Sequence, residues 1–161
     1  MDVLQSYFDN DQSLKDESLR PQMEKGFMWA CEFGQTEAVQ FILDAGFHID
    51  QQVEGMAGMH WAVLGAHIDT INLLIDRGAN LENENKYGGT VLESALWAVI
   101  HSDPVYRWPN VEVDFPAIIE ILLKGGAVIR PGVLSWLQQT DEIPLERKQP
   151  IEIVLKKYSA A

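Results

Sequence analysis

An internal repeat constrains the fold of this chain more than any other feature of its sequence. Trp29-Ala30 recurs 32 positions later as Trp61-Ala62, and a third copy places Ala95 a further 33 positions along. A dense apolar run follows in each copy and leads to a glycine. A step of this size is typical of repeat proteins, in which each copy is one supersecondary unit that buries its apolar face against its neighbours. The apolar runs are 41–43, 73–75 and 121–123, and the glycines are Gly46, Gly78 and Gly126.

Each copy is predicted to form two short helices followed by a turn. The small residues at Ala30, Ala62 and Ala95 allow neighbouring helices to approach closely. The apolar runs are too dense for a helix with one solvated face, so they indicate helices that pack on both neighbours in a stack. The glycine after each run should end the second helix in the left-handed conformation that glycine tolerates.

Three segments carry a resemblance to a known family. Ala57-Gly58-Met59-His60-Trp61-Ala62 stands where the ankyrin family has Thr-Pro-Leu-His-x-Ala, and Gly78-Ala79-Asn80 is similar to its Gly-Ala-x-Val-Asn. Asn85-Lys86-Tyr87-Gly88-Gly89-Thr90 resembles its Asp-x-x-Gly-x-Thr turn. The resemblance covers roughly Met23 to Arg130. It implies an all-α ankyrin-repeat solenoid of stacked helix-turn-helix units with short β-turn connections. Gly58 replaces the family's helix-starting proline, which should loosen that helix start.

The irregular segments give the expected domain organisation. Residues 1–22 are predicted to form an N-terminal helical cap, and residues 23–131 three ankyrin-like repeats. An insertion at about 100–114 interrupts the third repeat, and its two prolines indicate a loop. Residues 132–161 are predicted to form a C-terminal helical cap or degenerate repeat, because terminal units must shield the core from water.

The charge of the chain limits its partners. The sequence has 24 acidic and 12 basic residues, a formal charge of -12, and no lysine or arginine between Lys25 and Arg77. Such a surface repels phosphate backbones, so nucleic acid is not an expected partner. It attracts a basic protein surface and speeds the encounter with it. General solubility is the alternative explanation of the same imbalance.

Targeting features point to the cytoplasm. The N-terminus has no basic region followed by an apolar run, so no secretory signal is expected. No stretch approaches the roughly 18 apolar residues of a membrane span, so no membrane association is expected. Cys31 is the single cysteine, which excludes an intrachain disulfide and fits a reducing compartment.

The sequence offers no constellation that carries catalysis. The four histidines are not spaced as metal ligands, and neither a Cys-x-x-Cys nor a phosphate-binding loop occurs. We expect no catalytic residue, no metal and no cofactor, and therefore not an enzyme. Cys31 is interpreted as packed core, and His60 and His67 as structural residues that bond to backbone. His101, placed in the insertion, is the one histidine with a possible functional role.

The family resemblance also implies where a partner binds. In ankyrin stacks the first helix of each pair and the turn before it line a concave face. Large apolar or aromatic side chains stand at several of these positions, and tryptophan and tyrosine are enriched among binding hot spots. Burial of Trp97 under the insertion is the alternative, and Trp29 and Trp61 are interpreted as packing between repeats. The predicted partner-binding residues are Glu32, Phe33, Glu54, Met56, Leu64, Lys86, Tyr87, Trp97 and, in the insertion, Tyr106, Arg107 and Trp108.

The predicted function is therefore that of a non-catalytic, monomeric protein–protein interaction module with an acidic, aromatic-bearing concave face. An immunity or antitoxin-like protein that neutralises a basic effector is a narrower form of this hypothesis. A small-molecule or enzymatic site, with the insertion as a lid over Trp97 and His101, is the alternative from another class. A self-associating structural protein is a third.

Overall fold

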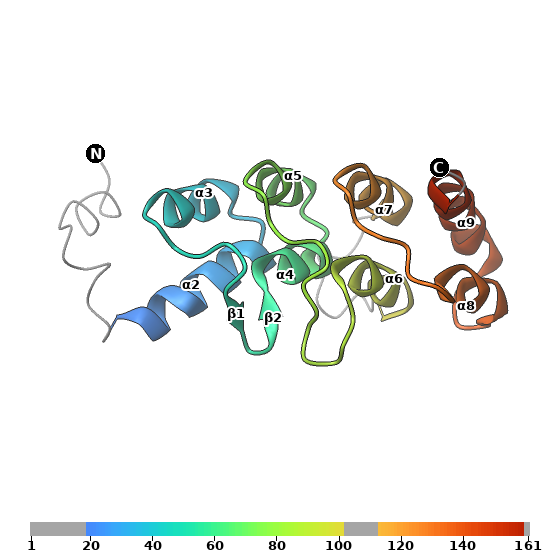
Figure 1. Ribbon diagram of the computed structural model, residues 1–161, viewed down its shortest axis with the longest axis horizontal. Coiled ribbons are helices and arrows are strands. Elements are labelled where there is room, and N and C mark those ends of the chain that lie inside the picture. The colour runs from blue at the N-terminus through green and yellow to red at the C-terminus, as the bar shows by residue number, and fades with distance from the viewer. Residues whose placement is uncertain (1–18, 102–112, 160–161) are drawn as a thin grey trace.

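The computed structural model describes residues 19–101 and 113–159. These residues form eight helices in two parallel rows, with one short hairpin (Figure 1). The predicted all-α stack of helix pairs is thus confirmed. The inner row holds α2 (Arg20–Glu32), α4 (Gly58–Gly65), α6 (Val91–His101) and α8 (Val133–Gln139). The outer row holds α3 (Thr36–Asp44), α5 (Ile68–Asp76), α7 (Phe115–Lys124) and α9 (Leu145–Ser159).

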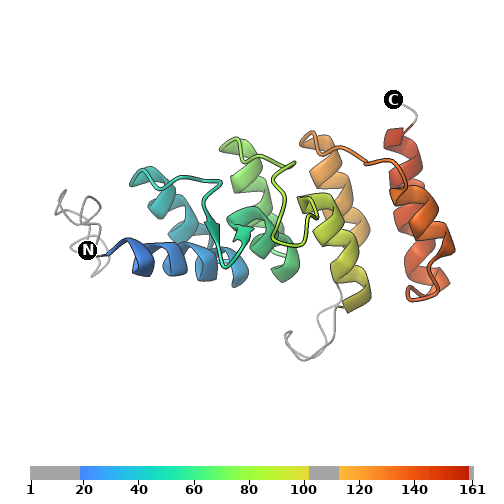
Figure 2. The same ribbon diagram turned by 60° about the horizontal axis from the view of Figure 1, so that its bottom comes forward.

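A two-stranded antiparallel hairpin connects the first two helix pairs. Strand β1 (Gln52–Val53) pairs with β2 (Met56–Ala57), with Gln52 opposite Ala57 and Val53 opposite Met56. Glu54 and Gly55 form the turn, both with positive φ. The hairpin and the following turn project from the same side of the inner row (Figures 1 and 2).

The core lies between the two rows and is continuous along the stack. Ala30, Ala62 and Ala95 are buried between the inner helices, as their recurrence predicted. The apolar runs of the outer helices supply one wall of this core. Because each helix pair packs on both neighbours, the fold is held mainly by contacts between repeats. The largest fully buried side chains include Phe27, Met59, Ile71, Leu74, Leu92, Ile118, Ile119, Leu122 and Leu137.

The outer helices end as the sequence predicted. Gly46, Gly78 and Gly126 have φ of 93°, 80° and 104°, the left-handed conformation. At the end of α5 the amide of Ala79 donates to the carbonyl of Leu74 at 3.0 Å. This bond spans five positions, as in a Schellman cap.

Gly58 begins α4 for a packing reason that the sequence did not reveal. A Cβ at this position would lie 2.5 Å from the Phe27 ring and 2.9 Å from the Cys31 Sγ. The missing proline therefore reflects the close approach of α4 to α2, since only glycine leaves room for both side chains.

The ends and the insertion refine the expected organisation. Helix α2 begins at Arg20, so it crosses the expected boundary between residues 22 and 23. Helix α6 continues to His101, which corrects the placement of this histidine in a loop; the helix ends there and α7 begins at Phe115. Helices α8 and α9 form the last pair of the stack. Residues 1–18 of the predicted N-terminal helical cap of residues 1–22, and residues 102–112 of the insertion, lie outside the described residues.

The substitution Gly65→Ala should weaken the contact between the first two repeats. A Cβ at residue 65 would collide with the backbone oxygen of Glu32 and with the ring of His67. We expect a loss of about 1–3 kcal/mol in the free energy of unfolding, measured by chemical denaturation. Gly26→Ala is the matched control, because a Cβ there meets nothing within 4 Å inside α2. It should raise stability by roughly 0.5–1 kcal/mol. Equal stability of both variants would contradict the described packing.

Candidate partner-binding face

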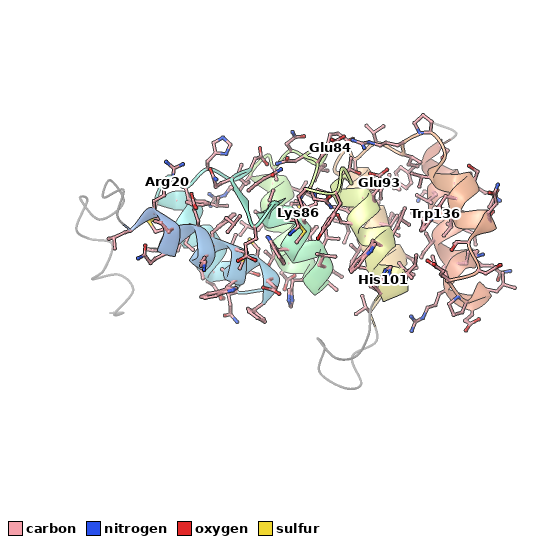
Figure 3. The ribbon with its side chains drawn as sticks, turned by 90° about the horizontal axis from the view of Figure 1, so that it is seen from below. Arg20, Glu84, Lys86, Glu93, His101 and Trp136 are labelled. Carbon is pink, nitrogen blue, oxygen red and sulfur yellow. The ribbon has the colours of Figure 1, made fainter. Side chains whose placement is uncertain are left out.

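The candidate site is the side of the stack formed by the inner helices and the turns that precede them, here called the inner face (Figure 3). The two central turns are joined by hydrogen bonds. The Lys86 amide donates to the Gly55 carbonyl at 2.8 Å, and the Gln52 side chain donates to Asn83 Oδ1 at 2.9 Å and to the Glu84 carbonyl at 2.7 Å. These bonds make one continuous rim beside the inner helices.

Three predicted residues occupy the same repeat position, near the end of successive inner helices. They are Glu32 in α2, Leu64 in α4 and Trp97 in α6. Glu32 and Leu64 are half-buried, and Leu64 packs against the core. Leu64, predicted to contact a partner, therefore already has a packing role in the stack.

Aromatic side chains are exposed on this face. The exposed fraction is 63% for Phe33, 81% for Tyr87 and 53% for Trp97, whereas Met56 is half-buried and Glu54 is exposed. Exposed aromatic side chains of this size, gathered on one face, mark interaction surfaces. The predicted residues Tyr106, Arg107 and Trp108 lie outside the described residues.

Trp29 departs from its predicted role. It was interpreted as packing between repeats, yet 52% of its surface is exposed. Trp61, at the same repeat position, is half-buried and packs against the core. The difference arises because α4 lies between α2 and α6, whereas α2 has an inner helix on one side only among the described residues. A useful signal in the sequence is that Trp29 lies three and four positions before Glu32 and Phe33, which is one helix face.

Trp97 forms a stacked pair with His101 at the end of α6. Their rings lie 4.1 Å apart between centroids with an interplanar angle of 11°. The His101 Nδ1 also lies 3.1 Å from the Trp97 carbonyl oxygen, one helical turn back. The stack favours this orientation of the exposed Trp97 indole.

Two predicted acidic residues interact with each other. Burial raises the pKa of Glu32, and the negative charge of Glu54 raises it further. The two carboxylates are therefore close enough to repel, with no compensating effect of a cation on the Glu32 pKa. Lys86 points its ammonium over its own neighbour, with Nζ 5.3 Å from the centroid of the Tyr87 ring.

Cations elsewhere in the stack tie one repeat to the next. Arg77 pairs with Asp44 at 2.7 Å, joining the first two outer helices. Arg130 pairs with Glu84 at 2.6 Å and with Glu93 at 3.5 Å, which joins the segment after α7 to the turn before α6 and to the first turn of α6 itself. Figure 3 shows Glu84 and Glu93 next to each other at this edge. The family resemblance did not reveal this clamp, because its partners are 46 and 37 positions apart.

His67 bonds to backbone, as the sequence predicted, whereas His60 is buried with neither ring nitrogen in a hydrogen bond among the described residues. His67 Nε2 lies 2.9 Å from the backbone oxygen of Glu32, and its ring fills the space left by Gly34 and Gly65. His60 is fully buried. Burial lowers the pKa of His60, and nearby backbone groups offset this only in part, so the neutral ring is favoured.

The Cys31 thiol should be unreactive in the folded protein. The side chain is fully buried, and burial raises its pKa to about 12. Since the thiolate is the reactive form, iodoacetamide near pH 8 should leave native protein unmodified and label it only in denaturant. Mass spectrometry of the intact chain measures the mass added by alkylation of the thiol. Rapid labelling without denaturant would show that α2 and α4 open readily.

Within the described residues, no group of three or more His, Cys, Asp or Glu side chains is placed to hold a metal ion. Among the same residues, no helix is both long enough and apolar enough to cross a membrane.

Comparison with known proteins identifies the class. Residues 26–105 match the family described as ankyrin repeats (3 copies). The chain is therefore an ankyrin-repeat protein, as its sequence motifs predicted, and ankyrin repeats are generally non-catalytic modules for protein–protein interaction. It is also similar to the E3 ubiquitin-protein ligase hecd-1 of Caenorhabditis elegans, with 33% identity over 67 residues. That match covers 42% of this chain and 2% of the length of the ligase.

Proposed function

We propose that this protein binds one protein partner through its inner face and catalyses no reaction. The observation that carries the proposal is the group of exposed aromatic side chains at family binding positions. Phe33, Tyr87 and Trp97 are each more than half exposed. Aromatic residues supply much of the binding energy in protein interfaces, because they bury a large area for little loss of conformational freedom. The concave side of the stack is the surface on which they would meet a partner.

Charge supports a partner with a basic surface. The chain carries a formal charge of -12. Among the described residues, neither Glu32 nor Glu54 on this face forms an ion pair with a lysine. A cation from a partner would relieve their mutual repulsion and speed association at low salt. The same charge disfavours nucleic acid. We place the protein in the cytoplasm as a monomer, and neutralisation of a basic effector is the narrower role that this surface would suit.

Purification of the tagged full chain from its source cells tests the proposal. One protein should be recovered in a stoichiometric amount with the wild-type chain, and its recovery should fall as salt is raised from low to moderate concentration. A tagged Trp97→Ala, Tyr87→Ala double variant is the control, and it should recover much less of that protein. Failure to recover any stoichiometric partner at either salt concentration would contradict the proposal.

A further inference from the structure

The last turn of α2 and the tip of the hairpin form a surface that combines aromatic rings with carboxylates. It consists of Trp29, Glu32, Phe33 and Glu54, here called the α2 patch. The Phe33 amide donates to the Trp29 carbonyl at 2.9 Å, so the helical geometry continues and places the two rings one turn apart on one face. Trp29 and Phe33 are 52% and 63% exposed.

The Glu32 carboxylate of the α2 patch lies in an unfavourable electrostatic environment. Burial and the charge of Glu54 both raise the pKa of Glu32, and no positive charge acts on it in return. Lys25 lies one turn before Trp29 in α2, and the Lys86 side chain packs on Gly55, next to Glu54. Lys86 has its ammonium over the Tyr87 ring, 5.3 Å from the centroid. A cation supplied from outside would therefore meet both negative charge and aromatic surface here.

Arginine suits such a surface better than lysine does. Its planar guanidinium stacks on aromatic rings and pairs with carboxylates through two parallel hydrogen bonds. It is also more weakly hydrated than an ammonium group, so less solvation is lost on contact. Lysine carries the same charge, but its ammonium group is not planar and does not present two parallel N–H donors. The α2 patch offers both kinds of group that a guanidinium binds, with two aromatic rings for stacking and two carboxylates as hydrogen-bond acceptors.

We propose that the α2 patch accepts an arginine side chain from an arginine-bearing segment of the protein partner. This inference rests on the proposed function and narrows it, because it names the residue type that the partner contributes. The partner's charge alone is then insufficient for full affinity. The Trp29 and Phe33 rings select guanidinium over ammonium, and Glu32 and Glu54 supply the opposite charge.

A set of matched peptides tests this inference without knowledge of the partner. The probe is a glycine–serine peptide with alternate arginines, compared with its lysine copy of equal charge by fluorescence anisotropy at about 0.15 M salt. The arginine peptide should bind about threefold tighter or more, the size of an exposed cation–aromatic contact. Trp29→Ala and Glu32→Gln should each weaken arginine-peptide binding about fivefold or more and remove the preference over lysine.

Matched variants separate the α2 patch from general charge attraction. Trp136→Ala on α8 and Glu146→Gln on α9 remove the same side-chain types elsewhere, and both should leave arginine-peptide binding and the arginine preference unchanged. Glu32→Gln also guards against unfolding, since it removes a charge that is already unfavourable. Equal binding of the two peptides, or an unchanged preference in Trp29→Ala, would overturn the inference. The natural partner could then bind the wild-type chain and Trp29→Ala with equal affinity but bind Trp97→Ala much more weakly. In that case the proposed function stands and this inference fails.

Discussion

The substitution Leu74→Ala should lower the free energy of unfolding by about 2–5 kcal/mol. Leu74 is fully buried in α5, where the second repeat packs on its neighbours. Removing its side chain leaves a cavity that rigid helices on both sides cannot close, so the loss exceeds the transfer free energy alone. Chemical denaturation followed by circular dichroism measures the change.

Asn72→Ala is the control for this prediction. Asn72 lies two positions earlier in the same helix and is exposed. Its replacement should change stability by no more than about 0.5 kcal/mol. A small effect at Leu74, similar to that at Asn72, would show that α5 is not packed as described.

The substitution Trp97→Ala should weaken partner binding by about 2 kcal/mol, roughly 30-fold in Kd. Trp97 is more than half exposed and stacks on His101, which favours one orientation of the indole in the free protein. An anchor that is already ordered loses little conformational entropy on binding. Titration calorimetry with the purified partner measures the affinity, and Tyr87→Ala should act in the same direction.

Thermal melting distinguishes a binding role of Trp97 from a structural one. Since the side chain lies at the surface, Trp97→Ala should change stability by far less than Leu74→Ala does. Trp136→Ala removes an exposed tryptophan from α8 and should alter neither binding nor stability greatly. A large loss of stability in Trp97→Ala with unchanged affinity would show that Trp97 belongs to the core.

The fold could be predicted because its determinants are local and recur. Ala30, Ala62 and Ala95 mark the inner helices, and a glycine with positive φ ends each of the first three outer helices. The glycines act within one turn of chain, and the alanines, although they pack between repeats, recur at a regular spacing that carries the information. Gly58 was harder to interpret, because its packing against Phe27 is a contact between repeats.

The candidate site could be predicted less completely, because exposure depends on neighbouring repeats. Trp29 and Trp61 are equivalent in sequence, yet one is exposed and the other packs against the core. Leu64 shares its repeat position with Trp97 but contributes to packing. The Arg130 clamp joins distant segments and has no local signature. Family position therefore selects the candidate residues for partner contact, but the packing of each repeat decides how far they are exposed.

Hydrogen–deuterium exchange of the chain with and without its purified partner tests the central claim most directly. Binding through the inner face should slow exchange in the β1–β2 hairpin, in residues 85–90 and in α4 and α6. The outer helices α3, α5 and α7 should exchange as in the free protein. Protection confined to those outer helices, with the inner face unchanged, would contradict the account.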